Sequence, residues 1–173
     1  MTWTAPVVER TKEPTLGDER TILEGYLEWQ RQTLLWKCSG LTAEQLKTAA
    51  APPSNLTLLG LVRHMTEVEY FWFTVRVHER TPDPIYCTEV SPDGDFDDVA
   101  GADAEADFAR FEAECRSSRA SVADLSLEHT FIHPRHRREM SLRWVYVHMI
   151  EEYARHNGHA DLIRERIDGV TGA

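Results

Sequence analysis

Cysteine is scarce in this sequence: the chain has three, Cys38, Cys87 and Cys115, and no two are spaced as C-x-x-C. An odd number of widely separated thiols argues against a disulfide framework and against a zinc site built from thiolates. We therefore expect three reduced cysteines with packing roles rather than a nucleophile, since none of them lies in a catalytic motif.

The sequence also lacks a long apolar run and an excess of basic residues. No run approaches the roughly 18 apolar residues of a membrane span, and the N-terminal MTWTAPVVERTKEP has no signal-peptide core. Lys and Arg total 19 against 29 Asp and Glu, and the formal net charge of −10 argues against nucleic-acid binding through a basic surface. We expect a cytoplasmic protein that binds neither membrane nor nucleic acid.

The length of 173 residues, with 42% hydrophobic residues, is typical of one globular domain with a sizeable core. Residues 1–16 contain Pro6 and Pro14 and show no periodicity, so we expect an extended lead-in on the surface. The single domain then comprises residues 17–173.

Apolar residues recur at helical spacing in four long stretches, which are bounded by capping or breaking residues. Thr42 and Gln45 form a capping box that begins a short helix before Pro52 and Pro53. The predicted helices are residues 18–40, 42–50, 57–78, 104–125 and 141–169. This order predicts an all-α chain folded as a four-helix bundle with a short extra helix.

Residues 79–103 are rich in Pro, Gly and acids, which predicts a long crossover loop. Acting as a lid is one role that this loop allows. Its acids follow no metal-ligand spacing, so we expect a solvated surface. In the link to the last helix, residues 130–132 favour a short extended piece. A group of basic residues follows: His133, Arg135, His136, Arg137 and Arg138. We expect these side chains to be solvated, and anion binding is the alternative.

The last predicted helix carries an unusual set of polar residues. Four of them fall at i, i+4, i+8 and i+11: His148, Glu152, His156 and His159. At about 100° per residue they lie within roughly 80° of one another around the helix axis. Val145 shares this face, which indicates that the face points towards a core. Unpaired polar groups there cost about 1–3 kcal/mol each, and one metal ion satisfies several at once.

A helical Glu and His four residues apart can bind one metal, and a His from a second helix completes three ligands. His64 is the histidine set deep within the predicted helix at 57–78. On the last helix the spacing leaves three pairs open: His148 with Glu152, Glu152 with His156, and His156 with His159. Three protein ligands leave a coordination position for water or substrate, which is typical of catalytic zinc.

Two segments, LLGLVRHMTEVEYFW and VHMIEEYARHNGHADLIRE, resemble the DinB/YfiT-like metalloenzyme superfamily. The chain is more similar to the actinobacterial branch that includes the metal-binding domain of mycothiol-dependent maleylpyruvate isomerase. The resemblance covers nearly the whole chain in helix order. It implies a DinB-like four-helix bundle that binds a divalent metal, zinc first, with nickel or iron as alternatives.

The resemblance assigns the metal ligands to His64, Glu152 and His156; most of the superfamily has His where Glu152 stands. It implies a metal-dependent transferase or isomerase that activates a low-molecular-weight thiol such as mycothiol for attack on a small electrophile. We expect His148 and His159 to hydrogen-bond these ligands or to contact substrate. Arg155 or Arg63 is a candidate to bind a substrate carboxylate, with a plain surface charge as the alternative.

Two other interpretations stay open, because a fold does not determine a function. In the first, the chain is a non-catalytic stress protein of the same fold that binds a metal or a small molecule. In the second, it binds no metal, and its histidines pair with Glu67, Glu151 and backbone groups. In each case we expect a monomer or a homodimer.

Overall fold

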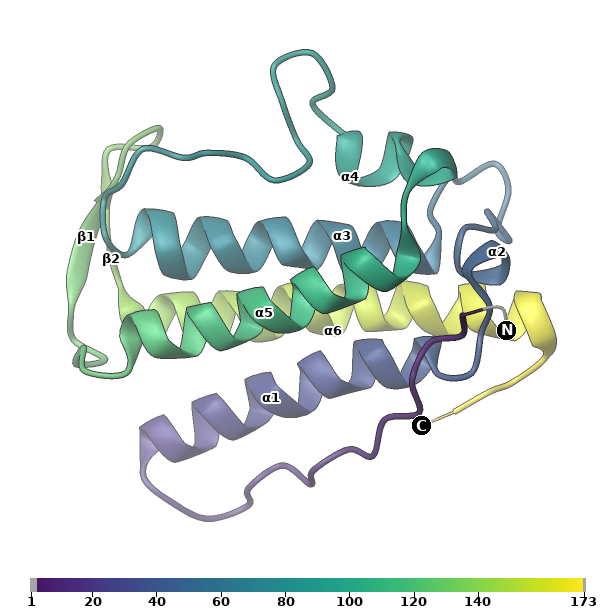
Figure 1. Ribbon diagram of the computed structural model, residues 1–173. Helices are drawn as coiled ribbons and strands as arrows, with labels where there is room; N and C mark the ends of the chain where they lie inside the picture. The colour runs from purple at the N-terminus through teal and green to yellow at the C-terminus, as the bar shows by residue number, and fades with distance from the viewer. Residues whose placement is uncertain (1–2, 173) are drawn as a thin grey trace.

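The computed structural model describes residues 3–172, and most of these residues are helical (Figure 1). The four longest elements are α1 (Glu19–Cys38), α3 (Leu58–Glu69) with its continuation η1 (Tyr70–Arg76), α5 (Ala104–Val122) and α6 (Leu142–Asp168). The short elements are α2 (Ala43–Leu46), α4 (Gly94–Asp97), η2 (Val99–Gly101), β1 (Thr130–His133) and β2 (Arg138–Ser141). The prediction of a mainly helical chain is confirmed.

Polar side chains begin the long helices. Asp18, Thr57, Asp103 and Ser141 each accept a hydrogen bond from the backbone N–H three residues later. Each bond satisfies one of the N–H groups that a helix start leaves without a partner, which is why these ends match the predicted ones. At the other end of α6, Gly169 adopts a left-handed backbone with φ of 78°, which glycine adopts without steric penalty.

The helix predicted at 57–78 changes its winding after Glu69. In η1 the backbone N–H of Val77 donates to the carbonyl of Trp72 at 3.1 Å, five residues back, which is the π-helical pattern. Apolar periodicity does not reveal this change, because residues four apart remain on nearly the same face in both windings.

The long helices pack side by side around an apolar core. α6 packs mainly against α1 and α3 mainly against α5, while α3 also contacts α6 (Figure 1). Fully buried side chains from all four fill the space between them: Leu27, Leu34, Leu61, Met65, Phe73, Phe111, Met149 and Tyr153. No helix within residues 3–172 is both long and apolar enough to cross a membrane.

A small hairpin joins α5 to α6. β1 pairs antiparallel with β2, and Phe131 opposite Met140 turns its side chain inward. The sequence predicted an extended piece at 130–132 but not its partner strand, so the all-α prediction misses this sheet. The N-terminal lead-in is also tied down, because Ala5 is buried and its N–H donates to the carbonyl of Leu41 at 2.8 Å.

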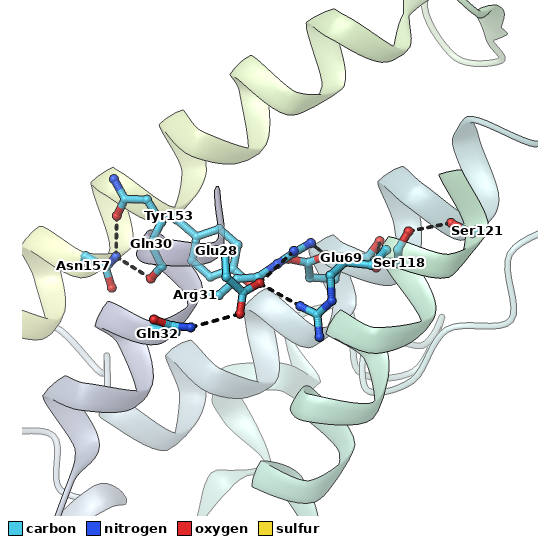
Figure 2. Close-up of polar contacts among 10 residues, drawn as sticks. Glu28, Gln30, Arg31, Gln32, Glu69, Ser118, Ser121, Tyr153 and Asn157 are labelled. Carbon is cyan, nitrogen blue, oxygen red and sulfur yellow. Dashed lines mark hydrogen bonds and ion pairs between the residues drawn. The ribbon is translucent and has the colours of Figure 1, made fainter. Parts of the chain in front are cut away.

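A buried ion pair crosses the core between α1 and α3 (Figure 2). Arg31 donates through Nε and Nη2 to the two carboxylate oxygens of Glu69, both at 2.7 Å. Tyr153 on α6 donates its hydroxyl to Glu69 Oε1 at 2.8 Å. Burial and the Glu69 charge raise the pKa of Tyr153 well above its ordinary value, so its phenol stays protonated. This network ties three long helices together.

All three cysteines are free thiols, and Cys38 and Cys115 are buried. Burial raises the pKa of Cys38 and of Cys87 to about 12, and it also raises the pKa of Cys115. Thiols in these surroundings stay protonated near neutral pH and are weak nucleophiles.

Candidate metal centre

Three side chains from two helices converge where α3 contacts α6. His64 of α3 and Glu152 and His156 of α6 each offer one ligand atom, and these atoms all lie within 4.8 Å of one another. The side chains are 25%, 15% and 11% exposed, so they are neither free in solvent nor sealed in the core. The structure therefore brings together the three residues that the resemblance assigned as metal ligands.

A fourth residue, Asp95 of α4, fixes the orientation of His64. Its carboxylate Oδ2 lies 2.7 Å from His64 Nδ1, and the Asp95 side chain is buried. An ionised carboxylate can only accept a hydrogen bond, so Nδ1 carries the proton and Nε2 keeps its lone pair free for a metal. A carboxylate behind a ligating histidine is the usual arrangement in metal sites.

Sequence reasoning missed Asp95, and the expectation that the acids of residues 79–103 are solvated is wrong for it. The residue lies 31 positions from His64 in a segment without periodicity. No spacing rule connects two such residues, and only the tertiary fold brings them together.

Arg63 holds the loop that carries Asp95. Its Nε donates to the Asp95 carbonyl at 3.0 Å, its Nη2 to the Gly94 carbonyl at 2.9 Å, and its Nη1 to Asp107 of α5 at 3.1 Å. Gly94 is required there, because a Cβ would lie 2.4 Å from the Tyr86 carbonyl. Arg63 was a candidate substrate contact; its guanidinium instead fastens α4 onto α3 and α5.

His156 is held in its neutral form. Its Nε2 lies 3.5 Å from Glu152 Oε2, and its Nδ1 lies 3.4 Å from His159 Nδ1. Burial first, and then the nearby charges of His64, His159 and Arg155, lower its pKa to about 4. A neutral imidazole has the lone pair that metal binding needs.

Two other predicted residues surround Glu152. His148 stacks on Trp144 with ring centroids 4.8 Å apart, and its Nε2 lies 3.9 Å from Glu152 Oε1. Arg155 places Nη1 3.6 Å from the same oxygen and pairs with Glu151 at 2.9 Å. Both side chains therefore lie within ion-pair distance of the Glu152 carboxylate.

A cavity of about 380 Å³ opens beside His64. One wall of the cavity is the α3–η1 face, and the other comes from the 79–103 loop. The lining residues are His64, Glu67, Val68, Phe71, Trp72, Arg76, Cys87, Pro92, Asp93, Asp95, Phe96 and His133. Glu67 pairs with no histidine here, because its carboxylate accepts hydrogen bonds from the backbone N–H groups of Ile85 and Tyr86. The cavity therefore reaches His64, one of the three converging side chains.

The donor set fits a divalent transition metal. Two imidazoles and one carboxylate are ligands that zinc, nickel and iron accept. Zinc binds such ligands at about 2.0–2.2 Å, so three donor atoms within 4.8 Å of one another can share one ion after small side-chain rotations.

A family model described as Mycothiol-S-transferase matches residues 22–169. The chain belongs to this family. The match confirms the resemblance to the mycothiol-linked branch of the DinB/YfiT-like proteins. No curated protein and no solved structure matches the chain. The matched span of this mycothiol S-transferase family member includes every residue of the candidate centre, and the family implies a thiol cosubstrate.

Replacing Asp95 by asparagine is expected to weaken zinc binding about 10–100-fold, because the amide no longer holds His64 in the tautomer that frees Nε2. Competition with a chromophoric chelator measures this affinity. Asp93→Asn is the matched control, since Asp93 lines the same cavity and Asp95 is the residue bonded to His64. Equal zinc affinities for the Asp95 variant and the wild type would contradict the assigned role of Asp95.

Proposed function

We propose that this member of the mycothiol S-transferase family joins a low-molecular-weight thiol, mycothiol first, to a small electrophile in a metal-dependent reaction. His64, Glu152 and His156 hold a divalent ion, zinc by preference. The observation that carries the proposal is the convergence of their ligand atoms within 4.8 Å beside a cavity of about 380 Å³. The four long helices are proposed to form a DinB-like four-helix bundle within one domain, residues 17–173.

The residues around the centre prepare it for this chemistry. When bound, a divalent ion lowers the pKa of a thiol in contact with it, so that a thiolate is available near neutral pH. Asp95 keeps the Nε2 lone pair of His64 free. Glu152 adds a negative charge that offsets part of the metal charge and so leaves the sulfur more nucleophilic than two histidines alone would.

The cavity provides the place for the electrophile. Phe71, Trp72 and Phe96 give it apolar walls, which exclude water from the reacting sulfur and carbon. In a substitution, the thiol loses its proton, sulfur bonds to the electrophilic carbon, and the leaving group departs with its electron pair. Holding both reactants in one cavity converts their encounter into a step within a single complex.

A second candidate is a non-catalytic metal- or small-molecule-binding stress protein. The proximity of His159 to His156, with the two Nδ1 atoms 3.4 Å apart, and of His148 to Glu152 favours it. Rotation of either histidine would supply a fourth protein ligand, and a closed four-ligand site is structural rather than catalytic.

Turnover of thiol distinguishes the two candidates. The zinc-loaded protein is expected to accelerate the reaction of mycothiol with 1-chloro-2,4-dinitrobenzene at least about 100-fold over buffer, because the metal supplies thiolate near pH 7. Product absorbance measures the rate. Chelation should abolish the acceleration and zinc should restore it. A zinc-loaded protein no faster than buffer across a panel of neutral and charged electrophiles would favour the stress-protein candidate.

A further inference from the structure

The cavity beside the candidate metal centre is lined by an arginine, Arg76, as well as by His64. His64, Val68, Trp72 and Arg76 follow one another every four residues along α3 and η1, and all four line the cavity. The π-helical turn is wider, because its hydrogen bonds reach five residues back rather than four, and this keeps residues four apart on the same side of the helix. One continuous helical face therefore begins at a metal ligand and ends at a guanidinium.

Arg76 also lines a neighbouring cavity of about 390 Å³ between η1 and the β1–β2 hairpin. Arg80 and Arg137 lie on its walls, together with Glu79. Glu79 Oε1 accepts a hydrogen bond from the backbone N–H of Ile132 at 3.1 Å, so its carboxylate is engaged with the hairpin. The two cavities thus share Arg76, and two further arginines line the second cavity.

In the part of the chain that the structure describes, these arginines are not neutralised by acidic side chains, although the protein as a whole has a net charge of −10. Arg31, Arg63 and Arg143 each bind a carboxylate. Within residues 3–172, by contrast, the guanidiniums of Arg76, Arg80 and Arg137 are within ion-pair distance of no carboxylate.

Arg76 is partly buried as well as unpaired with acid. It lies over the Phe71 ring, 5.1 Å from the ring centroid, and burial lowers its pKa. His133, which lines the same cavity, has its pKa lowered by burial and then by the charge of Arg76. A partly desolvated guanidinium among other positive groups gains most from an anion that binds it directly.

We propose that this end of the cavity is an anion subsite that binds a carboxylate on the electrophile. Arg76 forms the direct contact, while Arg80 and Arg137 raise the local positive potential. The flat apolar walls select a planar, unsaturated or aromatic body for that electrophile. The identity of the ligand as the electrophile rests on the proposed function, and the binding of an aromatic carboxylate does not.

The subsite also explains where substrate charge is recognised. Arg63 and Arg155, the two arginines that sequence reasoning offered for a substrate carboxylate, are engaged with Asp107 and Glu151. Arg76 faces the cavity instead. Arg137 belongs to the basic cluster of the link before α6, so the anion-binding alternative for that cluster is the one this proposal develops.

Binding of two isosteric probes tests the subsite. 3,5-Dinitrobenzoate and 3,5-dinitrobenzamide differ in charge but hardly in shape, and calorimetry on the zinc-loaded protein measures both. The benzoate should bind at least about tenfold more tightly to the wild type. Arg76→Gln should remove this preference and leave benzamide binding within about twofold, while Arg76→Lys should retain part of the preference because it keeps the charge.

The matched control is Arg116→Gln, because Arg116 is an exposed arginine on α5 outside both cavities. This variant should bind both probes as the wild type does. Equal affinities of the wild type for acid and amide would overturn the subsite. A preference that survives Arg76→Gln, as expected if the carboxylate binds the zinc ion instead, would also overturn it.

A separate measurement distinguishes failure of the subsite from failure of the proposed function. Mycothiol is allowed to react with 4-chloro-3,5-dinitrobenzoate and with 1-chloro-2,4-dinitrobenzene. Turnover of both with no loss of benzoate selectivity in Arg76→Gln would overturn the subsite alone. Absence of turnover with a benzoate preference that depends on Arg76 would overturn the transferase function and support the anion subsite.

Discussion

Replacing His156 by alanine is expected to lower zinc affinity by more than about 100-fold, a larger loss than removal of an outer hydrogen-bond partner causes. The variant loses one of the three assigned donors and keeps two, His64 and Glu152, which lie on different helices. Glu152→Ala should have a similar effect. Plasma mass spectrometry of the purified, tag-free proteins should find near one equivalent of metal in the wild type and a sharp loss in both variants.

A histidine remote from the centre provides the control for this measurement. His129 Nε2 lies 3.2 Å from the Val77 carbonyl, at the hairpin end of the molecule, so His129→Ala should keep the metal content of the wild type. Wild-type protein that stays metal-free after incubation with zinc would contradict the proposed centre. Equal metal content in the wild type and His156→Ala would contradict the role of this ligand.

Replacing Glu69 by glutamine is expected to lower the free energy of unfolding by about 3–5 kcal/mol, the largest stability effect that we predict. Glutamine keeps the shape of the side chain, but the buried charge of Arg31 then has only the more distant and more exposed carboxylate of Glu28, 3.5 Å from its Nη1, as a counter-charge. The effect should be large because Glu69 is fully buried and Arg31 is only 5% exposed. Urea denaturation followed by circular dichroism measures the loss.

Two further variants show whether burial causes this effect. Arg31→Met combined with Glu69→Leu should recover part of the stability, because it removes both charges and keeps the packing volume but leaves the buried Tyr153 hydroxyl without its acceptor. Arg143→Gln should cost only about 0–1 kcal/mol, because Arg143 pairs with Glu19 and Glu128 at the surface. Comparable losses from Glu69→Gln and Arg143→Gln would contradict the prediction.

The parts of the fold that depend on nearby residues could be predicted from the sequence. The starts of the long helices follow from side chains such as Asp18 and Ser141, whose partners lie three residues away. The β2 strand was missed because it is defined by pairing with β1 across a turn rather than by its own pattern. The one-turn helix α4 was missed because so short an element has no periodicity.

The candidate site divides in the same way. Helical spacing placed Glu152 and His156 on one face of α6, and the family resemblance supplied His64. Asp95 and Arg76 had no such signal, because their roles depend on how a loop and a hairpin fold against α3 and η1. Arg63 was considered as a contact for substrate, but in the structure its guanidinium holds the loop that carries Asp95, a role that depends on the tertiary fold.

The attachment of α4 to α3 couples two equilibria that are usually measured separately. Asp95 reaches His64 Nδ1 while Arg63 and Gly94 hold the loop in place, so the ordered loop and the metal-binding tautomer of His64 stabilise each other. Thermodynamic linkage makes this coupling reciprocal. Loosening the loop is therefore expected to weaken metal binding, and removing the metal is expected to favour the open loop by the same factor. Amide hydrogen exchange in residues 85–98 should then depend on the metal content of the protein.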